Sequence, residues 1–346
     1  MRFCDFGVVC WQQLSSSAAT MLHMELLYLN EDNVKELLDM KAALGVVEDA
    51  FREHGMRRVQ MPAKSYLYFP TGDLRTMPAY LQSAGIAGVK IVNVHPGNPA
   101  KELPTVMAVV VLNSIETGAP LAVISGTYLT DVRTGAAGGV AADILARRDA
   151  TVVGMVGAGR QAETQLRAIS LVREIETVKI SSRSAATCIR FREVIVDLGC
   201  DIVIAESARE ACDCDILITT TPTRTPIVVD DWVREGTHIN AIGADAKGKQ
   251  ELDPLILKRS TIVIDDPAQA THSGEINVPL KEKIITVDDI CCTLGEIVAG
   301  IKPGRGNDSE ITVFDSTGLA IQDVSTANHV YRQAVEKGIG TYLELF

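Results

Sequence analysis

Two ionisable residues lie beside apolar runs, where a charge is costly unless it has a partner or a function. Lys90 stands within the apolar run Val89–Val94, and burial lowers a lysine pKa toward the range that acid–base chemistry needs. A lysine on the solvent face of an edge strand is the alternative. Asp245 follows the run Thr237–Gly243, where a carboxylate can take a proton or hold an ammonium. Its alternative is an Asx turn.

A glycine-rich segment predicts a dinucleotide site. The apolar run Thr151–Val156 is followed by Gly157, Gly159 and Ala162, in the order G-x-G-x-x-A, and a helix is predicted to begin there. Gly157 permits the tight turn, Gly159 lets the backbone approach a pyrophosphate, and Ala162 permits close packing of helix and strand. A glycine turn without a ligand is the alternative. The pattern favours a nicotinamide dinucleotide.

The choice between NAD and NADP depends on residues after the next predicted strand. Such fingerprints place an acidic residue about 20 positions on, where it binds the ribose 2′-hydroxyl. Ser182 occupies that position, and Arg183 with its flanking serines, Ser182 and Ser184, can hold a 2′-phosphate. An arginine exposed to solvent in a loop is the alternative. The cofactor is therefore predicted as NAD or NADP, with the preference open.

These residues need two kinds of element to position them. Short strand-like runs separated by turns, preceded by a helix over Met40–His54, predict an antiparallel sheet with a helix against it. Further along, near-continuous Val and Ile runs alternate with helical segments, as is typical of a parallel sheet covered on both faces. The predicted strands of this second region are Thr151–Gly157, Thr177–Ser182, Asp201–Ala205, Asp215–Thr221, Thr237–Gly243 and Ser260–Asp265, with a further run at Glu310–Phe314.

The predicted fold is α/β. Residues 139–315 are expected to form a Rossmann-type doubly wound parallel sheet, and residues 24–138 a smaller α+β domain. A helix over Ala136–Arg148 is predicted to precede the first Rossmann strand. Within residues 316–346, a helix over Leu319–Lys337 is predicted to return to the first domain. Residues 1–23 are predicted to be a poorly ordered extension.

Composition excludes several classes of function. The 346-residue chain carries 33 Lys and Arg against 44 Asp and Glu, a formal net charge of −11, and no run of basic residues. Neither a nucleic-acid partner nor a membrane partner is therefore expected. No apolar run reaches the roughly 20 residues of a membrane span. The spacing of the eight cysteines and six histidines predicts reduced thiols in a cytoplasmic protein and no metal site.

Seven stretches of the chain together resemble the ornithine cyclodeaminase/μ-crystallin family, and most of all its archaeal-type alanine dehydrogenase branch. The resemblance extends from about Met24 to near the C-terminus. Members of this family are dimers of two-domain subunits, so the resemblance implies a homodimer that uses the first domain for substrate binding and dimerisation. The stretches are Met61–Lys64, Leu74–Pro78, Lys90–Pro99, Arg133–Ala136, Gly157–Gln161, Gly243–Glu251 and Ser316–Asp323.

The resemblance also implies roles for single residues. Lys90 matches the catalytic lysine, Asp245 the catalytic aspartate, and Lys64 a basic residue that holds the substrate carboxylate. Ser316 lies in a segment beside the nicotinamide. Together with the glycine-rich segment and its neighbours, the predicted cofactor contacts are Arg133, Gly157, Gly159, Arg160, Gln161, Ser182, Arg183, Ser184, Thr220, Gly243, Ala244 and Ser316.

Arg75 separates this chain from ornithine-specific members of the family, which carry an acid before Met-Pro for the side-chain amine of ornithine. A cation repels that amine and favours a carboxylate or carbonyl oxygen, so a small amino acid or 2-oxo acid fits better. The expected reaction converts L-alanine reversibly into pyruvate and ammonium, with Lys64 and Arg75 binding the carboxylate. The alternatives are an ornithine cyclodeaminase, a cyclic ketimine or pyrroline-carboxylate reductase, and a dinucleotide-binding protein without turnover.

Overall fold

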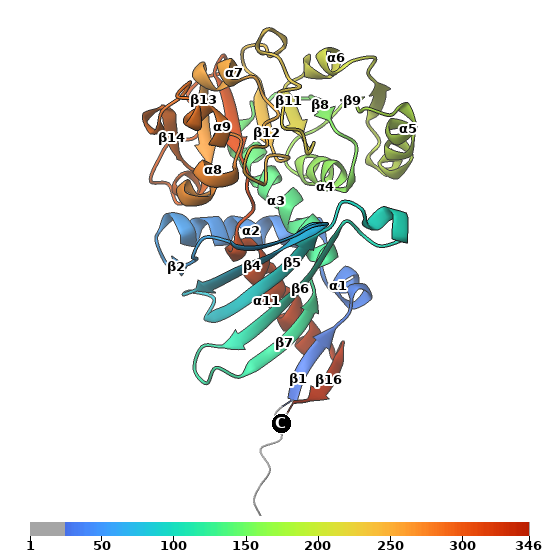
Figure 1. Cartoon of the computed structure of the whole chain (residues 1–346), viewed down its shortest axis with the longest axis vertical. Helices are drawn as coiled ribbons and strands as arrows, with labels where there is room; N and C mark the ends of the chain where they lie inside the picture. The colour runs from blue at the N-terminus through green and yellow to red at the C-terminus, as the bar shows by residue number, and fades with distance from the viewer. Residues whose placement is uncertain (1–24, 346) are drawn as a thin grey trace, which may run out of the picture.

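The computed structural model describes residues 25–345, and within them the strands form two eight-stranded sheets. Figure 1 shows the two sheets one above the other, with α3 (Thr127–Leu145) running between them. The predicted extension over residues 1–23 lies outside the described residues. The predicted α/β fold, with a parallel Rossmann-type sheet and a second α+β unit, is confirmed.

The first sheet is mixed. Its order is β16–β1–β7–β6–β5–β4–β2, with β3 paired to β4, and only the β1–β7 pair is parallel. The β1 and β16 strands at one edge were not predicted, because they bring together the two ends of the described chain. The strands are β1 (Glu25–Leu29), β2 (Val59–Gln60), β3 (Ser65–Phe69), β4 (Gly72–Leu81), β5 (Ile86–Val94), β6 (Val106–Ser114), β7 (Pro120–Ser125) and β16 (Thr341–Glu344).

One face of this sheet is covered by helices. Alternate residues of β4 are buried, as expected for a strand with one face on a core. The helix α11 (Ala320–Lys337) packs on β4, β5 and β6, and α2 (Met40–Gly55) packs on α11 and α3. In Figure 1 α11 crosses the first sheet from the centre of the molecule toward β16. The shorter α1 (Glu31–Leu37) also contacts α11.

The second sheet is entirely parallel, in the order β10–β9–β8–β11–β12–β15–β13–β14. All residues of β11 and β12 are buried, which agrees with the mostly apolar sequence of β11, whereas β12 buries the polar His238 and Asn240, which hydrogen-bond to each other. The strands are β8 (Val152–Val156), β9 (Thr177–Ser181), β10 (Asp201–Ile204), β11 (Ile216–Thr219), β12 (His238–Ala241), β13 (Ser260–Ile264), β14 (Ile290–Thr293) and β15 (Ile311–Asp315). The accompanying helices are α4 (Arg160–Ile169), α5 (Ala185–Val194), α6 (Ala208–Cys212), α7 (Pro254–Lys258), α8 (Pro267–Ser273), α9 (Asn277–Lys281) and α10 (Leu294–Val298), with 3₁₀ turns at Asn98–Lys101, Val196–Leu198, Asp230–Trp232 and Val287–Asp289.

Every strand predicted for this region is present, but the order of the strands in the sequence does not give their order in the sheet. The run predicted at Glu310–Phe314 is β15, which lies between β12 and β13 near the middle of the sheet. The edge strand β14 was not predicted. Its four residues include two cysteines and carry no period that distinguishes them from a loop.

The helix predicted at Ala136–Arg148 is α3, and its predicted bounds were wrong. It begins at Thr127 and ends at Leu145, and it extends across the predicted boundary between residues 138 and 139. Every residue from Leu129 to Ala142 is buried, so the helix has no exposed face and its first turns carry no amphipathic signal. A methyl group on Gly135 would overlap the backbone carbonyl of Thr164 in α4, so glycine permits close contact of the two helices.

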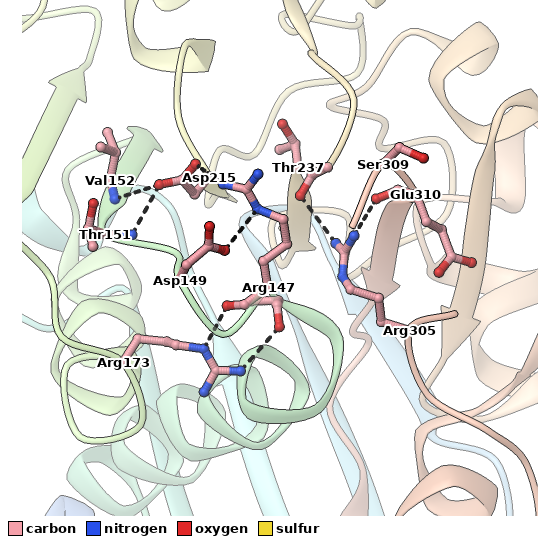
Figure 2. Close-up of polar contacts among 12 residues, drawn as sticks. Arg147, Asp149, Thr151, Val152, Arg173, Asp215, Thr237, Arg305, Ser309 and Glu310 are labelled. Carbon is pink, nitrogen blue, oxygen red and sulfur yellow. Dashed lines mark hydrogen bonds and ion pairs between the residues drawn. The ribbon is translucent and has the colours of Figure 1, made fainter. Parts of the chain in front are cut away.

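The C-terminal end of α3 is fixed to the amino ends of the second sheet. Figure 2 shows the Asp215 carboxylate accepting hydrogen bonds from the backbone N–H groups of Thr151 and Val152 and from Arg147. Arg173 donates to carbonyl oxygens in the last turn of α3, and Arg305 donates to the Leu145 carbonyl. The bonds to Asp143 and Leu145 satisfy carbonyls that the helix itself leaves free, whereas the Ala142 carbonyl also accepts from the Ala146 backbone N–H. They hold the helix at one end while its first half lines the pocket described next.

Candidate active site

A cavity of about 310 Å³ lies where the first sheet meets the carboxyl ends of the parallel strands. Doubly wound sheets bind their ligands at this edge. The cavity wall combines residues of β4, β5 and β6, the first half of α3, and the loops that follow β11, β12 and β15. Nine of the predicted site residues line it: Lys64, Arg75, Lys90, Arg133, Gln161, Thr220, Gly243, Asp245 and Ser316.

Lys90 lies at the middle of β5, between β4 and β6, and its side chain is 1% exposed. The alternative of a lysine on the solvent face of an edge strand is therefore wrong. Its Nζ atom donates to Asp323 Oδ1 at 2.8 Å. Burial and the nearby Arg133 guanidinium lower the pKa of Lys90 to about 7, although Asp323 opposes the change.

Arg133 comes from α3 and is 5% exposed. Its Nε atom donates to the same Asp323 Oδ1 atom at 2.8 Å, and its Nη1 atom donates to Gln322 Oε1 at 2.9 Å. The sequence predicted a dinucleotide contact for Arg133. In the structure its polar contacts are with α11, and it lies beside Lys90 in the pocket wall.

Asp245 and Arg75 meet across the pocket, although 170 positions separate them in the sequence. The Arg75 Nη1 atom donates to Asp245 Oδ2 at 3.0 Å, and its Nε atom donates to Asp73 Oδ1 at 2.7 Å. Lys249 forms an ion pair with the other oxygen of Asp245. Burial opposes ionisation of Asp245, but Lys249 and Arg75 outweigh it and hold the pKa of its carboxyl well below the usual range. The carboxyl is thus ionised at neutral pH, and Asp245 is more than an Asx turn.

Lys64 reaches the pocket from the segment before β3. Its Nζ atom donates to the Thr317 carbonyl oxygen, and burial lowers its pKa to about 8, with Asp265 opposing. The fully buried Asp265 carboxylate accepts hydrogen bonds from the backbone N–H groups of Thr317 and Gly318. The loop after β15 is therefore fixed between one cation and one carboxylate.

The glycine-rich segment forms the predicted turn between β8 and α4. Gly157 has a φ of 112°, a left-handed conformation that favours glycine, and a side chain there would overlap the Thr220 hydroxyl. Asp131 of α3 accepts hydrogen bonds from Gln161 Nε2 at 2.8 Å and from Arg160 Nη1 at 3.3 Å. Burial raises the pKa of Asp131 to about 6, with Arg160 opposing. The amino end of α4 is thus held to α3.

Several unpartnered polar atoms fit a bound dinucleotide. The side-chain oxygens of Thr130, Gln161 and Thr220 are buried, line the pocket and have no hydrogen-bond partner among residues 25–345. A ligand with polar edges satisfies such atoms, whose burial is otherwise costly. A second cavity of about 790 Å³ at the amino end of α4 is lined by Gly159 and Arg160 among others. Together the turn, the helix end and the two cavities fit an extended dinucleotide.

Four other predicted residues, Ser182, Arg183, Ser184 and Ala244, do not line the first cavity, and Gly243 lines it without a free backbone donor. Arg183 and Ser184 are exposed, Ser182 is half-buried, and within the described chain Arg183 has no hydrogen bond or ion pair. The Ala244 side chain is buried. The backbone N–H of Gly243 donates to Glu251 Oε2 at 2.8 Å, so this donor already has a partner. The contact of Arg183 with a 2′-phosphate stays a prediction.

Three residues that the structure adds to the site were not singled out from the sequence: Lys249, Asp131 and Asp323. Lys249 stands four positions after Asp245, a spacing that sequence analysis can use. Asp131 lies in α3 and Asp323 in α11, and no residue near either one in the sequence indicates its contacts. Within residues 25–345 no group of three or more His, Cys, Asp or Glu is arranged to hold a metal ion. No helix in that range is long and apolar enough to cross a membrane.

Known proteins are similar to this chain in sequence and in fold. An alanine dehydrogenase of Archaeoglobus fulgidus is 52% identical over 93% of this chain and 99% of its own length. A solved structure described as an archaeal alanine dehydrogenase dimer with bound NAD is 51% identical, covers 93% of this chain and all of its own, and superposes with a TM-score of 0.91.

The same architecture occurs in a relative with another activity. The Δ¹-pyrroline-2-carboxylate reductase of Thermococcus litoralis, solved in complex with NADH and L-proline, is 41% identical over 91% of this chain and 99% of its own, with a TM-score of 0.89. The model of the ornithine cyclodeaminase/mu-crystallin family matches residues 24–338, which confirms the resemblance inferred from the seven motifs. The chain belongs to the ornithine cyclodeaminase/mu-crystallin family.

Proposed function

We propose that this protein is an NAD-dependent alanine dehydrogenase, which converts L-alanine and water reversibly into pyruvate and ammonium. The observation that carries the proposal is a buried lysine with a pKa of about 7 facing an ionised aspartate across a small pocket. The pocket lies at the dinucleotide edge of the Rossmann sheet. Identity of 52% with an alanine dehydrogenase over nearly the whole chain supports the same activity.

The proposed cofactor is NAD, which is bound in the similar archaeal structure. The Gly157 turn and the amino end of α4 would hold the pyrophosphate, and the free oxygens of Thr130, Gln161 and Thr220 would bind polar edges of the nicotinamide half. When bound, NAD accepts a hydride from the substrate. Acceptance of NADP remains a prediction that depends on Arg183.

The distribution of charge in the pocket favours binding of a carboxylate at one end. Lys90 and Arg133 share the single carboxylate of Asp323, and Lys64 donates only to a carbonyl oxygen. These three side chains thus carry more positive charge than their direct partners balance, and with Lys90 neutral, as in the mechanism below, the excess lies on Lys64. We propose that the substrate carboxylate binds on their side of the pocket, since an unbalanced buried cation gains most from an anion.

The opposite end is electrically balanced. Arg75 and Lys249 are matched by Asp73 and Asp245, so Arg75 has less charge to offer a substrate than its sequence position predicted. In this arrangement Arg75 and Lys249 fix the Asp245 carboxylate. Asp245 would accept hydrogen bonds from the substrate amino group, and later from the water that attacks the imine and from the departing ammonium.

Lys90 supplies the proton transfer in this mechanism. L-Alanine enters as an ammonium, and the neutral amine of Lys90 takes one proton from it, so that the nitrogen lone pair can form the C=N bond as hydride leaves the α-carbon. Water then adds to the iminium carbon, and the C–N bond breaks to give pyruvate and ammonium. A side chain whose pKa lies near the operating pH is suited to this exchange.

Pyrroline-carboxylate reduction is the second candidate, because a reductase of that substrate has the same architecture at 41% identity. One experiment separates the two. Purified protein is mixed with NAD and L-alanine, L-proline or L-ornithine, and both the absorbance of NADH and the release of ammonium are followed. Reduction of NAD with L-alanine but not with L-proline supports the proposal. The reverse result, or turnover of L-ornithine without net NADH formation, would replace it with the reductase or the cyclodeaminase.

We further propose that the enzyme is a homodimer, as its archaeal relative is. The face of the first sheet opposite α11 carries a patch of half-exposed residues, Val89, Ile91, Val109, Val111 and Val123, which are paired across β5, β6 and β7. Patches of this kind mark protein interfaces. Light scattering should give a dimer for the native protein and a monomer for V111D. A native monomer would contradict the proposal.

A further inference from the structure

Asp323, in the first turn of α11, contacts two pocket cations through one atom. Its Oδ1 atom lies 2.8 Å from Lys90 Nζ and 2.8 Å from Arg133 Nε. Its side chain is fully buried, and within the described residues Oδ2 has no hydrogen-bond partner. One oxygen therefore fixes the relative positions of cations that come from β5 and α3.

This arrangement is costly for a purely structural contact. Three cations from separate elements face one another here: Lys90 on β5, Arg133 on α3 and Lys64 before β3. Arg133 and Lys64 each lower the tendency of Lys90 to carry charge, and Asp323 is the carboxylate in direct contact with Lys90. A buried charge cluster stabilises a fold only weakly, because desolvation offsets the attraction.

The helix that carries Asp323 is itself fixed to the pocket. Gln322 accepts hydrogen bonds from the Leu319 backbone N–H at 3.1 Å and from Arg133 Nη1 at 2.9 Å, so one side chain closes the first turn of α11 and holds the arginine. An anionic residue is favoured in this first turn. α11 packs across β4, β5 and β6, so the Asp323 carboxylate is carried by a rigid element.

We infer that Asp323 is a positioning residue of the reaction, which holds the Lys90 amine and the Arg133 guanidinium side by side so that both face the substrate. The inference rests on the proposed function, because it assigns Lys90 the proton transfer. Loss of the carboxylate leaves two cations in contact without their shared partner. Lys90 then turns away from Arg133 and releases its proton more readily.

The first experiment measures the protonation of Lys90 directly and does not require catalytic turnover. Cyanate carbamoylates only the neutral form of an amine, and peptide mass spectrometry separates Lys90 from Lys64. The rate of Lys90 modification against pH should reach its half-maximum near pH 7 in the native protein. In D323N the half-maximum should lie lower by about one to two pH units, since a hydrogen bond to a charged group is lost. An unchanged half-maximum overturns the inference.

The second experiment measures kinetics with L-alanine and NAD. D323N should lower kcat by about 100-fold, the cost of misplacing a reacting group by about an ångström. T326V is the matched control, since Thr326 is a fully buried residue of the same helix whose hydroxyl has no partner among residues 25–345. T326V should keep the native kcat and the native pH profile. A D323N enzyme with native kcat, or a T326V enzyme with the same loss as D323N, overturns the positioning role.

A third variant covers the case in which D323N does not fold. In R133M the shared oxygen belongs to Lys90 alone and a repelling cation is gone, so the half-maximum of carbamoylation should move to higher pH. No movement would overturn the shared-oxygen arrangement. The two proposals fail separately: a native protein that does not oxidise L-alanine contradicts the proposed function, whereas the modification profiles test Asp323 without a substrate.

Discussion

Raising the pH from about 6 to about 8 should titrate Lys90 in the free enzyme, because burial and Arg133 lower its pKa to about 7. The proposed mechanism uses the neutral amine of Lys90 and the ammonium form of L-alanine. The value of kcat/KM for alanine oxidation should therefore rise with pH through this range and then level off. This quantity reports the ionisations of the free enzyme.

The size of the rise distinguishes a perturbed lysine from an ordinary one. With a pKa of about 7, the neutral fraction of Lys90 increases from roughly 9% at pH 6 to roughly 91% at pH 8, which is about tenfold. With the ordinary value of 10.5 the neutral fraction would increase about 100-fold over the same range and continue to increase above it.

The assay is the initial rate of NADH formation at low alanine concentration across this pH range. Lys64, with a pKa of about 8, is the other pocket amine that titrates nearby, and K64R removes its titration while it keeps the charge. The inflection near pH 7 should persist in K64R. In K90A it should be absent, with kcat lowered by about 10²–10⁴-fold. A rise of about 100-fold without a plateau, or an inflection that survives K90A, would refute the assignment of this ionisation to Lys90.

Three further predictions concern the cofactor, the substrate and the fold. Arg183→Ala should lower kcat/KM with NADP by about tenfold or more and leave kcat/KM with NAD unchanged, because the charge-assisted bonds to a 2′-phosphate are lost. Equal effects on both cofactors would place Arg183 outside the site. Arg75→Glu should lower kcat/KM for alanine and pyruvate in steady-state kinetics and allow turnover of L-ornithine, since the pocket loses a cation beside Asp245 and gains an anion. Kinetic constants for pyruvate equal to those of the native enzyme would contradict this. Gly135→Ala should lower the free energy of unfolding, measured by urea titration, by about 1–3 kcal/mol, because α3 and α4 must move apart. The control is Gly45→Ala in α2, where a methyl group meets no other atom, and this change should not destabilise the protein.

The sequence alone determined the features that depend on neighbouring residues. The turn at Gly157 and the helix after it follow from local backbone sterics, and the buried parallel strands follow from unbroken apolar runs. The presence of Arg75 before Met77-Pro78 and of Lys90 in an apolar run are also local facts. From these the Rossmann-type sheet, the cofactor class and a buried lysine as the candidate for catalysis could be predicted.

The surroundings of these groups form only when the chain is folded. Asp323 lies 233 positions from Lys90 and Asp245 lies 170 from Arg75, so no local pattern reports either contact. The bounds of α3 were mispredicted because a helix buried on all sides has no amphipathic period. The pKa of Lys90 depends on burial and on charges from α3 and α11, and both exist only when the chain is folded. Residue types select the chemistry, whereas the electrostatics that make it work arise from long-range packing.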